Sequence, residues 1–398
     1  MTGQPLRIAV IGAGIGGLTA ALSLRRAGFD VDIYEQAPAL THIGGGINMG
    51  PNAARILIRL GLGEGLLRDG VCPGSTHQRR WDDGRTLQRS PLNPQCEELY
   101  GAPHVTIHRA DLLAVISAGL PAERVHLGYR LVGFADKGDH VEAWFDNGER
   151  IAPDILVGAD GIHSAVRANL FGEEAPRFAG CVAYRGLVPV ERLADLDLER
   201  GSQSWVGPGA HLVHYFVSRG ELLNFVGWTE HDAWNREDWT DRATVARALA
   251  AFEGWHPQIR RIIGAADECF IWALFDRDPL PRWSVGRVTL LGDACHPMYP
   301  FMGQGAAQAI EDGAALAACL AADAEHPADA LRHYERLRLP RVTLLQEMSR
   351  ANKRRFHMRD GTEQQARDAE WARAGDRSPD ALRWLYEHDP AAVEPAPV

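Results

Sequence analysis

The stretch from Arg7 to Glu35, RIAVIGAGIGGLTAALSLRRAGFDVDIYE, decides the fold of this chain. Residues 7–11 are a short apolar run that predicts a buried strand, and apolar residues then recur at helical spacing. Gly28 is placed to end that helix, and residues 31–34 predict a second strand that finishes on Glu35. The order strand, turn, helix, strand predicts a βαβ unit and a parallel sheet.

Three glycines, Gly12, Gly14 and Gly17, form a G-x-G-x-x-G motif in the turn after the first strand. Gly12 permits the tight turn, Gly14 lets a pyrophosphate approach the backbone, and Gly17 lets helix and strand pack closely. The helix N-terminus supplies free N–H groups for the phosphates. Glu35, which Gln36 follows, is placed to bind ribose hydroxyls. The segment predicts a dinucleotide site without saying which dinucleotide binds.

Further strands are expected downstream of this unit. Residues 154–157 and 288–291 are apolar and predict buried strands. Residues 211–217 and 222–228 are strand-like and are separated by the turn at 218–221, which predicts an antiparallel sheet. The dinucleotide-binding domain is therefore expected to be interrupted by a sheet-rich module.

Three later motifs identify the kind of dinucleotide site. They are His108-Arg109-x-Asp111-Leu112, Gly158-Ala159-Asp160-Gly161 and Gly292-Asp293-Ala294-Cys295-His296-Pro297. Together with the first motif, and over roughly residues 5–350, they resemble the fingerprints of the class A FAD-dependent aromatic hydroxylases. The stretches EQAPAL, GINMGPNAARI, VTIHRADL and GADGIHSAVR are similar to the group that contains 6-hydroxynicotinate 3-monooxygenase, 3-hydroxybenzoate 6-hydroxylase and salicylate hydroxylase.

The resemblance implies an α/β fold like that of para-hydroxybenzoate hydroxylase. A Rossmann-like FAD-binding domain is interrupted by a mixed or antiparallel substrate sheet, and the C-terminal region is helical. The expected FAD-binding parts are residues 1–75, 105–178 and 276–330. The expected substrate-domain parts are residues 76–104 and 179–275, and C-terminal helices and a tail are expected at 331–398.

FAD is the cofactor that the resemblance implies, with NADH, in preference to NADPH, as electron donor. Arg109 resembles the arginine that reaches the flavin cofactor in that family. Asp160 resembles the aspartate that supports the flavin site and the approach of the nicotinamide nucleotide. Asp293, just past a strand end, can accept hydrogen bonds from ribityl hydroxyls.

A helix is expected from about Gly305, after Pro297 and the segment that contains Gly303. The resemblance implies that its N-terminus, with Gly305 and Ala306, faces the pyrimidine edge of the flavin. A helix N-terminus favours anions, so it would stabilise negative charge on the reduced ring.

Two residues in the expected antiparallel sheet, His211 and Tyr215, match substrate-pocket residues of the hydroxynicotinate enzymes. They share one face of a strand, and His214 points to the other face. A flavin hydroperoxide is electrophilic, so removal of the proton from a ring hydroxyl activates the substrate. A histidine or a hydrogen-bonded tyrosine can take that proton. Four nearby aromatic residues are candidates for the pocket walls, but most of them are expected to be ordinary sheet core: Trp205, Phe216, Phe225 and Trp228.

Three candidate pocket residues depart from the hydroxynicotinate pattern. Asn48 stands where those enzymes carry a histidine, and Tyr299 and Phe301 stand where a lysine and a histidine are expected. The loss of these polar groups indicates a less charged or differently substituted ring. A carboxylated pyridine and a decarboxylative reaction are therefore open questions at this point.

Composition limits the function. The 398 residues are enough for two domains. Lys and Arg number 42 against 52 Asp and Glu, and this net charge of −10 argues against nucleic acid as a partner. No run approaches the roughly 18 apolar residues of a membrane span. The six cysteines lack metal-ligand spacing. We expect a cytoplasmic protein with reduced thiols and no metal.

The function that these observations predict is hydroxylation of a small phenolic or hydroxypyridine ring, often an aromatic acid, with O₂ and NAD(P)H. Relatives of this kind are often dimers, so a homodimer is compatible with the resemblance. Two alternatives remain open. One is a flavin epoxidase or hydroxylase of a larger secondary-metabolite scaffold, and the other is a non-catalytic FAD-binding interaction module.

Overall fold

The computed structural model describes residues 5–40, 44–232 and 242–392. Within these ranges a parallel sheet has the strand order β18-β11-β1-β2-β7. Its strands are β1 (Arg7–Ile11), β2 (Asp30–Glu35), β7 (Val125–Leu127), β11 (Ile155–Gly158) and β18 (Val288–Leu290). The predicted βαβ unit and both predicted later strands are confirmed, with ends that differ by one residue.

Helix α1 (Ile15–Arg26) connects β1 to β2 and packs against α9 (Gly305–Ala322). A Cβ atom on Gly313 would lie 2.8 Å from the backbone nitrogen of Ala20, so glycine is what lets the two helices approach so closely. The N-termini of α1 and α9 are therefore fixed relative to each other.

A larger mixed sheet has the order β16-β17-β12-β15-β14-β13-β4-β5. Its strands are β4 (Ser75–Arg80), β5 (Thr86–Pro91), β12 (Arg177–Pro189), β13 (Ser202–Gly207), β14 (Ala210–Val217), β15 (Leu222–Glu230), β16 (Arg242–Ala243) and β17 (Cys269–Asp276). The expected antiparallel pairing of β14 with β15 is confirmed, and β13 pairs with β4 in parallel. Strands from distant parts of the chain thus share one sheet.

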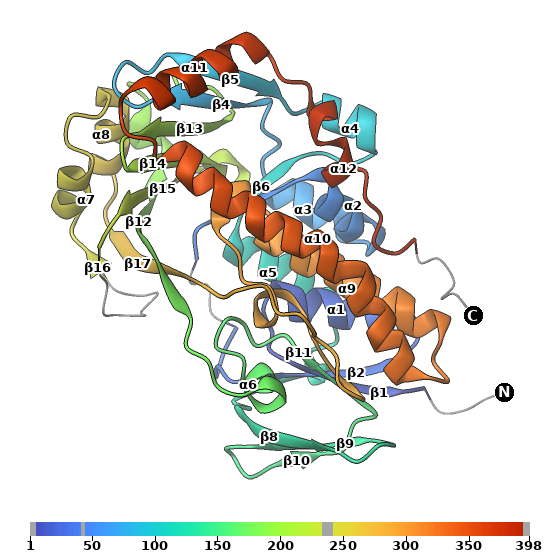
Figure 1. Cartoon of the computed structure of the whole chain (residues 1–398). Coiled ribbons are helices and arrows are strands. Elements are labelled where there is room, and N and C mark those ends of the chain that lie inside the picture. Colours follow the sequence, from blue (N-terminus) through green and yellow to red (C-terminus); the bar gives the residue numbers. More distant parts are fainter. Residues whose placement is uncertain (1–4, 41–43, 233–241, 393–398) are drawn as a thin grey trace.

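Five further strands of the described residues lie outside these two sheets: β3 (Gly46–Met49), β6 (Val105–His108), β8 (Leu131–Asp136), β9 (Val141–Phe145) and β10 (Arg150–Ile151). Strands β8, β9 and β10 form a three-stranded sheet, and β3 pairs with β6. The remaining helices are α2 (Pro51–Arg59), α3 (Gly63–Asp69), α4 (Gln95–Tyr100), α5 (Arg109–Ser117), α6 (Ala165–Phe171), α7 (Val245–Ala251), α8 (Pro257–Gly264), α10 (Pro327–Phe356), α11 (Thr362–Ala374) and α12 (Arg383–Tyr386). Helix α10 crosses the molecule from the larger sheet to α9 (Figure 1).

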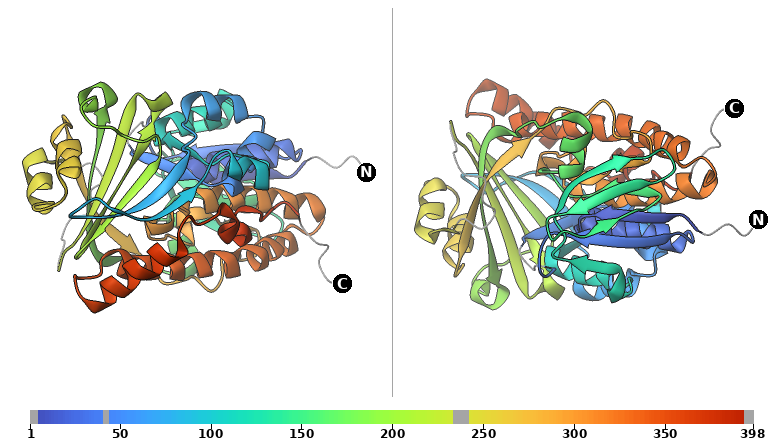
Figure 2. Two further views of the ribbon diagram at one scale, coloured as in Figure 1. Left: turned by 90° about the horizontal axis from the view of Figure 1, so that it is seen from above. Right: turned by 90° about the horizontal axis from the view of Figure 1, so that it is seen from below.

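Each of the two larger sheets has its own apolar core. One core surrounds the parallel sheet, and the other lies between the larger sheet and α7 and α8, which cover its outer face (Figure 2). Trp205, Phe216 and Phe225 belong to the second core, as expected. Trp228 does not, because it packs with Tyr299 and Phe301 in a small cluster between the sheet and the β18–α9 connection. That cluster places the opposite, inner face of the larger sheet against the predicted flavin edge.

Candidate active site

The glycine turn after β1 is tightly packed on one side and open on the other. A Cβ atom on Gly17 would lie 2.0 Å from the carbonyl oxygen of Gly12, whereas one on Gly14 would meet no described atom within 4 Å. Gly14 caps α1, and no side chain of the described residues bonds to the first turn, which also lacks acidic residues. The N–H groups there are available to an anion such as a pyrophosphate.

Glu35 lies at the carboxyl end of β2, beside this turn. Its Oε2 accepts a hydrogen bond from the Ala13 backbone N–H at 2.7 Å, and its Oε1 accepts one from the Ala37 N–H at 2.9 Å. Each carboxylate oxygen keeps a lone pair that a ribose hydroxyl can use. Gln36 is exposed next to it.

The charges of Arg109 and Asp293 act on each other. Burial lowers the pKa of Arg109, and Asp293 opposes that shift. Burial raises the pKa of Asp293, while His296 and Arg109 lower it. Asp293 is nevertheless reached by solvent, as expected of a residue that lines a cleft. Neither side chain hydrogen-bonds within the described ranges, so both fit a polar ligand such as FAD.

A buried network holds the Asp293 segment in place. The Asp312 carboxylate accepts hydrogen bonds from the Gly292 N–H at 2.9 Å and from Arg338 Nε at 2.8 Å, and it contacts His296 Nε2 at 2.6 Å. Burial alone would raise the pKa of Asp312, but His296 and Arg338 outweigh it and lower the pKa to about 2. The ionised network fixes the turn between β18 and α9.

The start of α9 lies beside Asn48. Gly303 has φ +63°, and a Cβ atom on it would lie 3.6 Å from the Asn48 Cβ. Gly305 and Ala306 form the first turn of α9, where the described residues supply no side-chain cap. The Pro297 carbonyl upstream accepts a hydrogen bond from Gln346. The N-terminus of α9 is thus a second helix end that lacks a side-chain cap among the described residues.

Asp160 has a structural role of its own. Its carboxylate accepts hydrogen bonds from Ser164 Oγ at 2.5 Å and from the Val166 N–H at 3.1 Å, so it caps α6. The neighbouring Ala159 carbonyl packs on Gly12. The segment therefore shapes the glycine turn. A role for the Asp160 side chain in supporting the flavin site stays a prediction.

Strand register assembles the inner face of the larger sheet. His211 pairs with Trp228, and Tyr215 pairs with Asn224. Arg185 on β12 pairs with Val226, which lies between Asn224 and Trp228 on the same face of β15. Cross-strand partners point to the same side, so all of these side chains face the predicted flavin edge. His214 points the other way and accepts a hydrogen bond from Trp205 Nε1 at 3.2 Å.

His211 and Tyr215 contact different parts of that edge. The His211 ring is 4.9 Å from the Phe301 ring, and burial lowers its pKa well below the usual value, so the ring is neutral. Tyr215 packs on Gly46, where an added Cβ would lie 2.4 Å from the tyrosine ring. Burial also raises the pKa of the Tyr215 hydroxyl. The two residues line one wall without touching.

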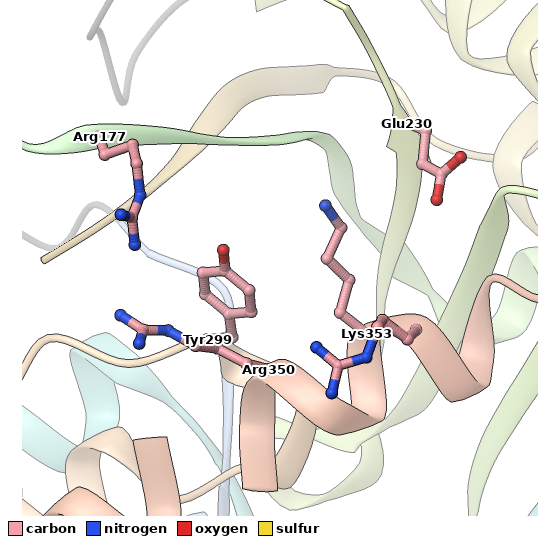
Figure 3. A pocket seen from close by; sticks show the side chains of 6 residues that line it. Arg177, Glu230, Tyr299, Arg350 and Lys353 are labelled. Carbon is pink, nitrogen blue, oxygen red and sulfur yellow. The ribbon is translucent and has the colours of Figure 1, made fainter. Parts of the chain in front are cut away.

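The three other candidate pocket residues have different partners. Asn48 hydrogen-bonds to His104, whose pKa burial lowers to about 4, and Phe301 packs on His211. Tyr299, whose ring lies 5.6 Å from that of Phe301, lines a cavity of about 300 Å³ (Figure 3). This outer polar pocket is formed by Arg177, Glu230, Tyr299, Arg350, Lys353 and Arg354.

Sequence reasoning missed three residues of the site. Arg185 stacks on Trp272 with 4.5 Å between guanidinium and ring, and its pKa is lowered to about 10 by burial and by Arg109. His104 supports Asn48, and His357 supports His211. A charged residue within the apolar run CVAYRGLV was the one available signal, and it pointed to Arg185.

Comparison with known proteins agrees with this geometry. Residues 6–349 match the family described as FAD binding domain. The chain is 42% identical over 387 residues to 3-amino-4-hydroxybenzoate 2-monooxygenase PtmB3 of Streptomyces platensis, covering 97% of each chain. It is 40% identical over 361 residues to 6-hydroxynicotinate 3-monooxygenase of Bordetella bronchiseptica, covering 88% of this chain and 92% of that protein.

A solved structure, that of Klebsiella pneumoniae HpxO complexed with FAD and uric acid, superposes with a TM-score of 0.85 at 30% identity. The alignment covers 96% of this chain and 95% of HpxO. No helix of the described ranges is long and apolar enough to cross a membrane. The chain therefore belongs to the FAD binding domain family, in the branch of FAD-dependent aromatic-ring monooxygenases.

Proposed function

We propose that this protein hydroxylates a small aromatic acid that already carries a ring hydroxyl, with O₂ and with NADH as the favoured electron donor. FAD, once bound and reduced, supplies the activated oxygen that enters the ring. The glycine turn, Glu35, Arg109, Asp293 and the α9 N-terminus are the groups that would hold it. Because NADH is a cytoplasmic electron donor, we place the reaction in the cytoplasm.

One observation carries the substrate class. The inner face of the larger sheet presents a neutral His211 and a buried cation, Arg185, towards the predicted flavin edge. A neutral imidazole can accept the proton of a ring hydroxyl, and a guanidinium binds a carboxylate well. The S. platensis relative is named for 3-amino-4-hydroxybenzoate, which has both groups, so that compound is the first probe.

The test measures NADH and NADPH oxidation by the flavin-loaded protein with hydroxylated benzoates, nicotinates and uncharged phenols. Product and hydrogen peroxide are quantified together. We expect one hydroxylated acid to accelerate oxidation and to give stoichiometric hydroxylated product. The proposal fails if no carboxylated ring accelerates oxidation, or if all of the oxygen consumed appears as peroxide. Acceleration by a larger scaffold alone would place the protein with the epoxidases or hydroxylases of such compounds.

A further inference from the structure

His211 also contacts a second buried histidine, His357. Its Nδ1 lies 2.7 Å from Nε2 of His357, which directly follows α10. Both imidazoles are buried. Nε2 of His211 makes no hydrogen bond within the described part of the chain, so it remains available to a substrate hydroxyl.

His357 in turn reaches the surface through Glu230. Its Nδ1 lies 3.4 Å from Glu230 Oε1 at the end of β15, and the Glu230 side chain is 38% exposed. Glu230 belongs to the outer polar pocket, where Figure 3 shows its carboxylate on the wall. A line of titratable groups therefore runs from the inner face of the sheet to solvent.

We propose that His211, His357 and Glu230 form a proton relay that carries the proton of the substrate's ring hydroxyl out of the closed pocket. This inference rests on the proposed function. The O–H bond of the ring hydroxyl breaks, and an N–H bond forms at Nε2 of His211. The proton on Nδ1 of His211 passes to Nε2 of His357, and the proton on Nδ1 of His357 passes to Glu230 and then to water. The ring keeps the electron pair as an oxyanion.

The charges around the relay suit this direction. Burial lowers the pKa of His357, Glu230 raises it, and Lys353 and Arg359 lower it, so the ring is neutral at pH 7. Glu230 is held ionised, because the bond to His357 lowers its pKa more than burial raises it.

Among the described residues of the neighbouring strands, the further titratable group in contact with His357 is Cys181. The Cys181 Sγ on β12 lies 4.0 Å from its Nδ1, and burial raises the pKa of that thiol to about 11. The thiol is therefore protonated at neutral pH and cannot take the proton. The ring of Phe301, in the β18–α9 connection, also packs on His357, with 6.0 Å between ring centroids, and it has no proton to exchange.

His211, His357 and Glu230 would lie at the same distances if they had only a structural role. The test must therefore measure the transfer of the proton itself. Proton release on substrate binding is recorded by stopped flow with an indicator dye in weak buffer. We expect His357→Ala to slow release by at least ~10-fold, and added imidazole to restore it. Glu230→Gln should slow release less, because water can replace a surface group. Glu221→Gln, at the exposed residue just before the same strand, is the matched control and should change nothing.

Nitrogen-15 NMR of the histidines tests the relay without any turnover. The relay requires Nδ1–H on His211 donating to His357, and Nδ1–H on His357 donating to Glu230. The opposite tautomers, or release in His357→Ala that is unslowed or not rescued by imidazole, would overturn it. If no aromatic acid accelerates NADH oxidation by the wild-type protein, the proposed function fails and the relay is not the cause. Flavin content and circular dichroism establish that each variant is folded.

Discussion

The two walls of the active site are built in different ways. The cofactor wall takes the glycine turn, Glu35 and Asp293 from the carboxyl ends of the parallel strands β1, β2 and β18, and Arg109 from the residue after β6. The substrate wall takes its groups from β3, β12, β14 and β15, which only strand register brings together. Changes on the first wall should therefore act through local packing and cofactor binding, and changes on the second through chemistry.

The largest effect should separate two glycines of the same turn. Gly17→Ala places a methyl group 2.0 Å from the Gly12 carbonyl oxygen, so we expect a loss of about 3 kcal/mol or more in the free energy of unfolding. Gly14→Ala meets open space in the protein, so the apoprotein should lose about 1 kcal/mol or less. Its FAD affinity should nevertheless fall more than ~10-fold.

Urea unfolding of the apoproteins and flavin titration measure both quantities. Equal stability losses in the two variants, or unchanged FAD affinity in Gly14→Ala, would contradict a turn that is packed on one side and open to ligand on the other.

The same contrast explains what the sequence could predict. Glu35 and Asp293 were found because each stands at a fixed offset within one motif, and the structure places Glu35 beside the glycine turn and Asp293 in charge contact with Arg109. Arg185 and His104 were missed because their importance depends on which strands become neighbours. The sequence did not distinguish Trp228 from the other three aromatic residues, yet its register partner is His211 on the inner face.

The contacts of Tyr299 and Phe301 were also beyond the sequence. The turn at Pro300–Met302 leaves their rings 5.6 Å apart, yet Tyr299 also lines the outer polar pocket, whereas Phe301 packs on His211. Motifs report local geometry, and they do not report how a short helical turn redirects a side chain.

The next effect concerns the buried network behind the cofactor wall. Arg338→Met removes the buried cation that Glu311 and Asp312 share and leaves them Arg341 and His296 as partners, so we expect a loss of about 3 kcal/mol in the free energy of unfolding. Arg332→Met, which breaks an exposed ion pair on the same helix, should cost less than about 1 kcal/mol.

The pH dependence of stability follows from the two buried carboxylates, Glu311 and Asp312. Their folded pKa values, about 2, lie below the usual 4.5 and 3.8, so their stabilisation is full above about pH 4.5 and is lost as pH falls towards 2. Arg338→Met should flatten that acid limb in thermal unfolding. A variant that keeps the wild-type limb would show that other carboxylates control it.

On the substrate wall, two histidines of one strand offer a matched pair. His211→Gln removes the proton acceptor, so kcat should fall ~100-fold and its pH profile should change. The His214 side chain faces the opposite core and accepts a hydrogen bond from Trp205. His214→Gln should therefore cost about 1 kcal/mol in the free energy of unfolding and leave kcat nearly unchanged. Steady-state kinetics over a range of pH would contradict the assignment if both variants lost activity alike.

The smallest effect should come from Arg185, and it bears on the substrate itself. Its pKa of about 10 keeps the guanidinium charged at neutral pH, within a wall of Trp272 and other apolar groups. Arg185→Met conserves volume and removes the charge, so the KM of a hydroxylated benzoate should rise ~10-fold with little change in kcat, as expected for a group that binds ground and transition states equally. The corresponding phenol without a carboxylate supplies the control, because its KM should not change. If the KM of both substrates rises, Arg185 supports the packing of the wall and does not bind the carboxylate. The carboxylate must then be bound by another cation, and Arg109, whose charge lowers the pKa of Arg185, is the candidate.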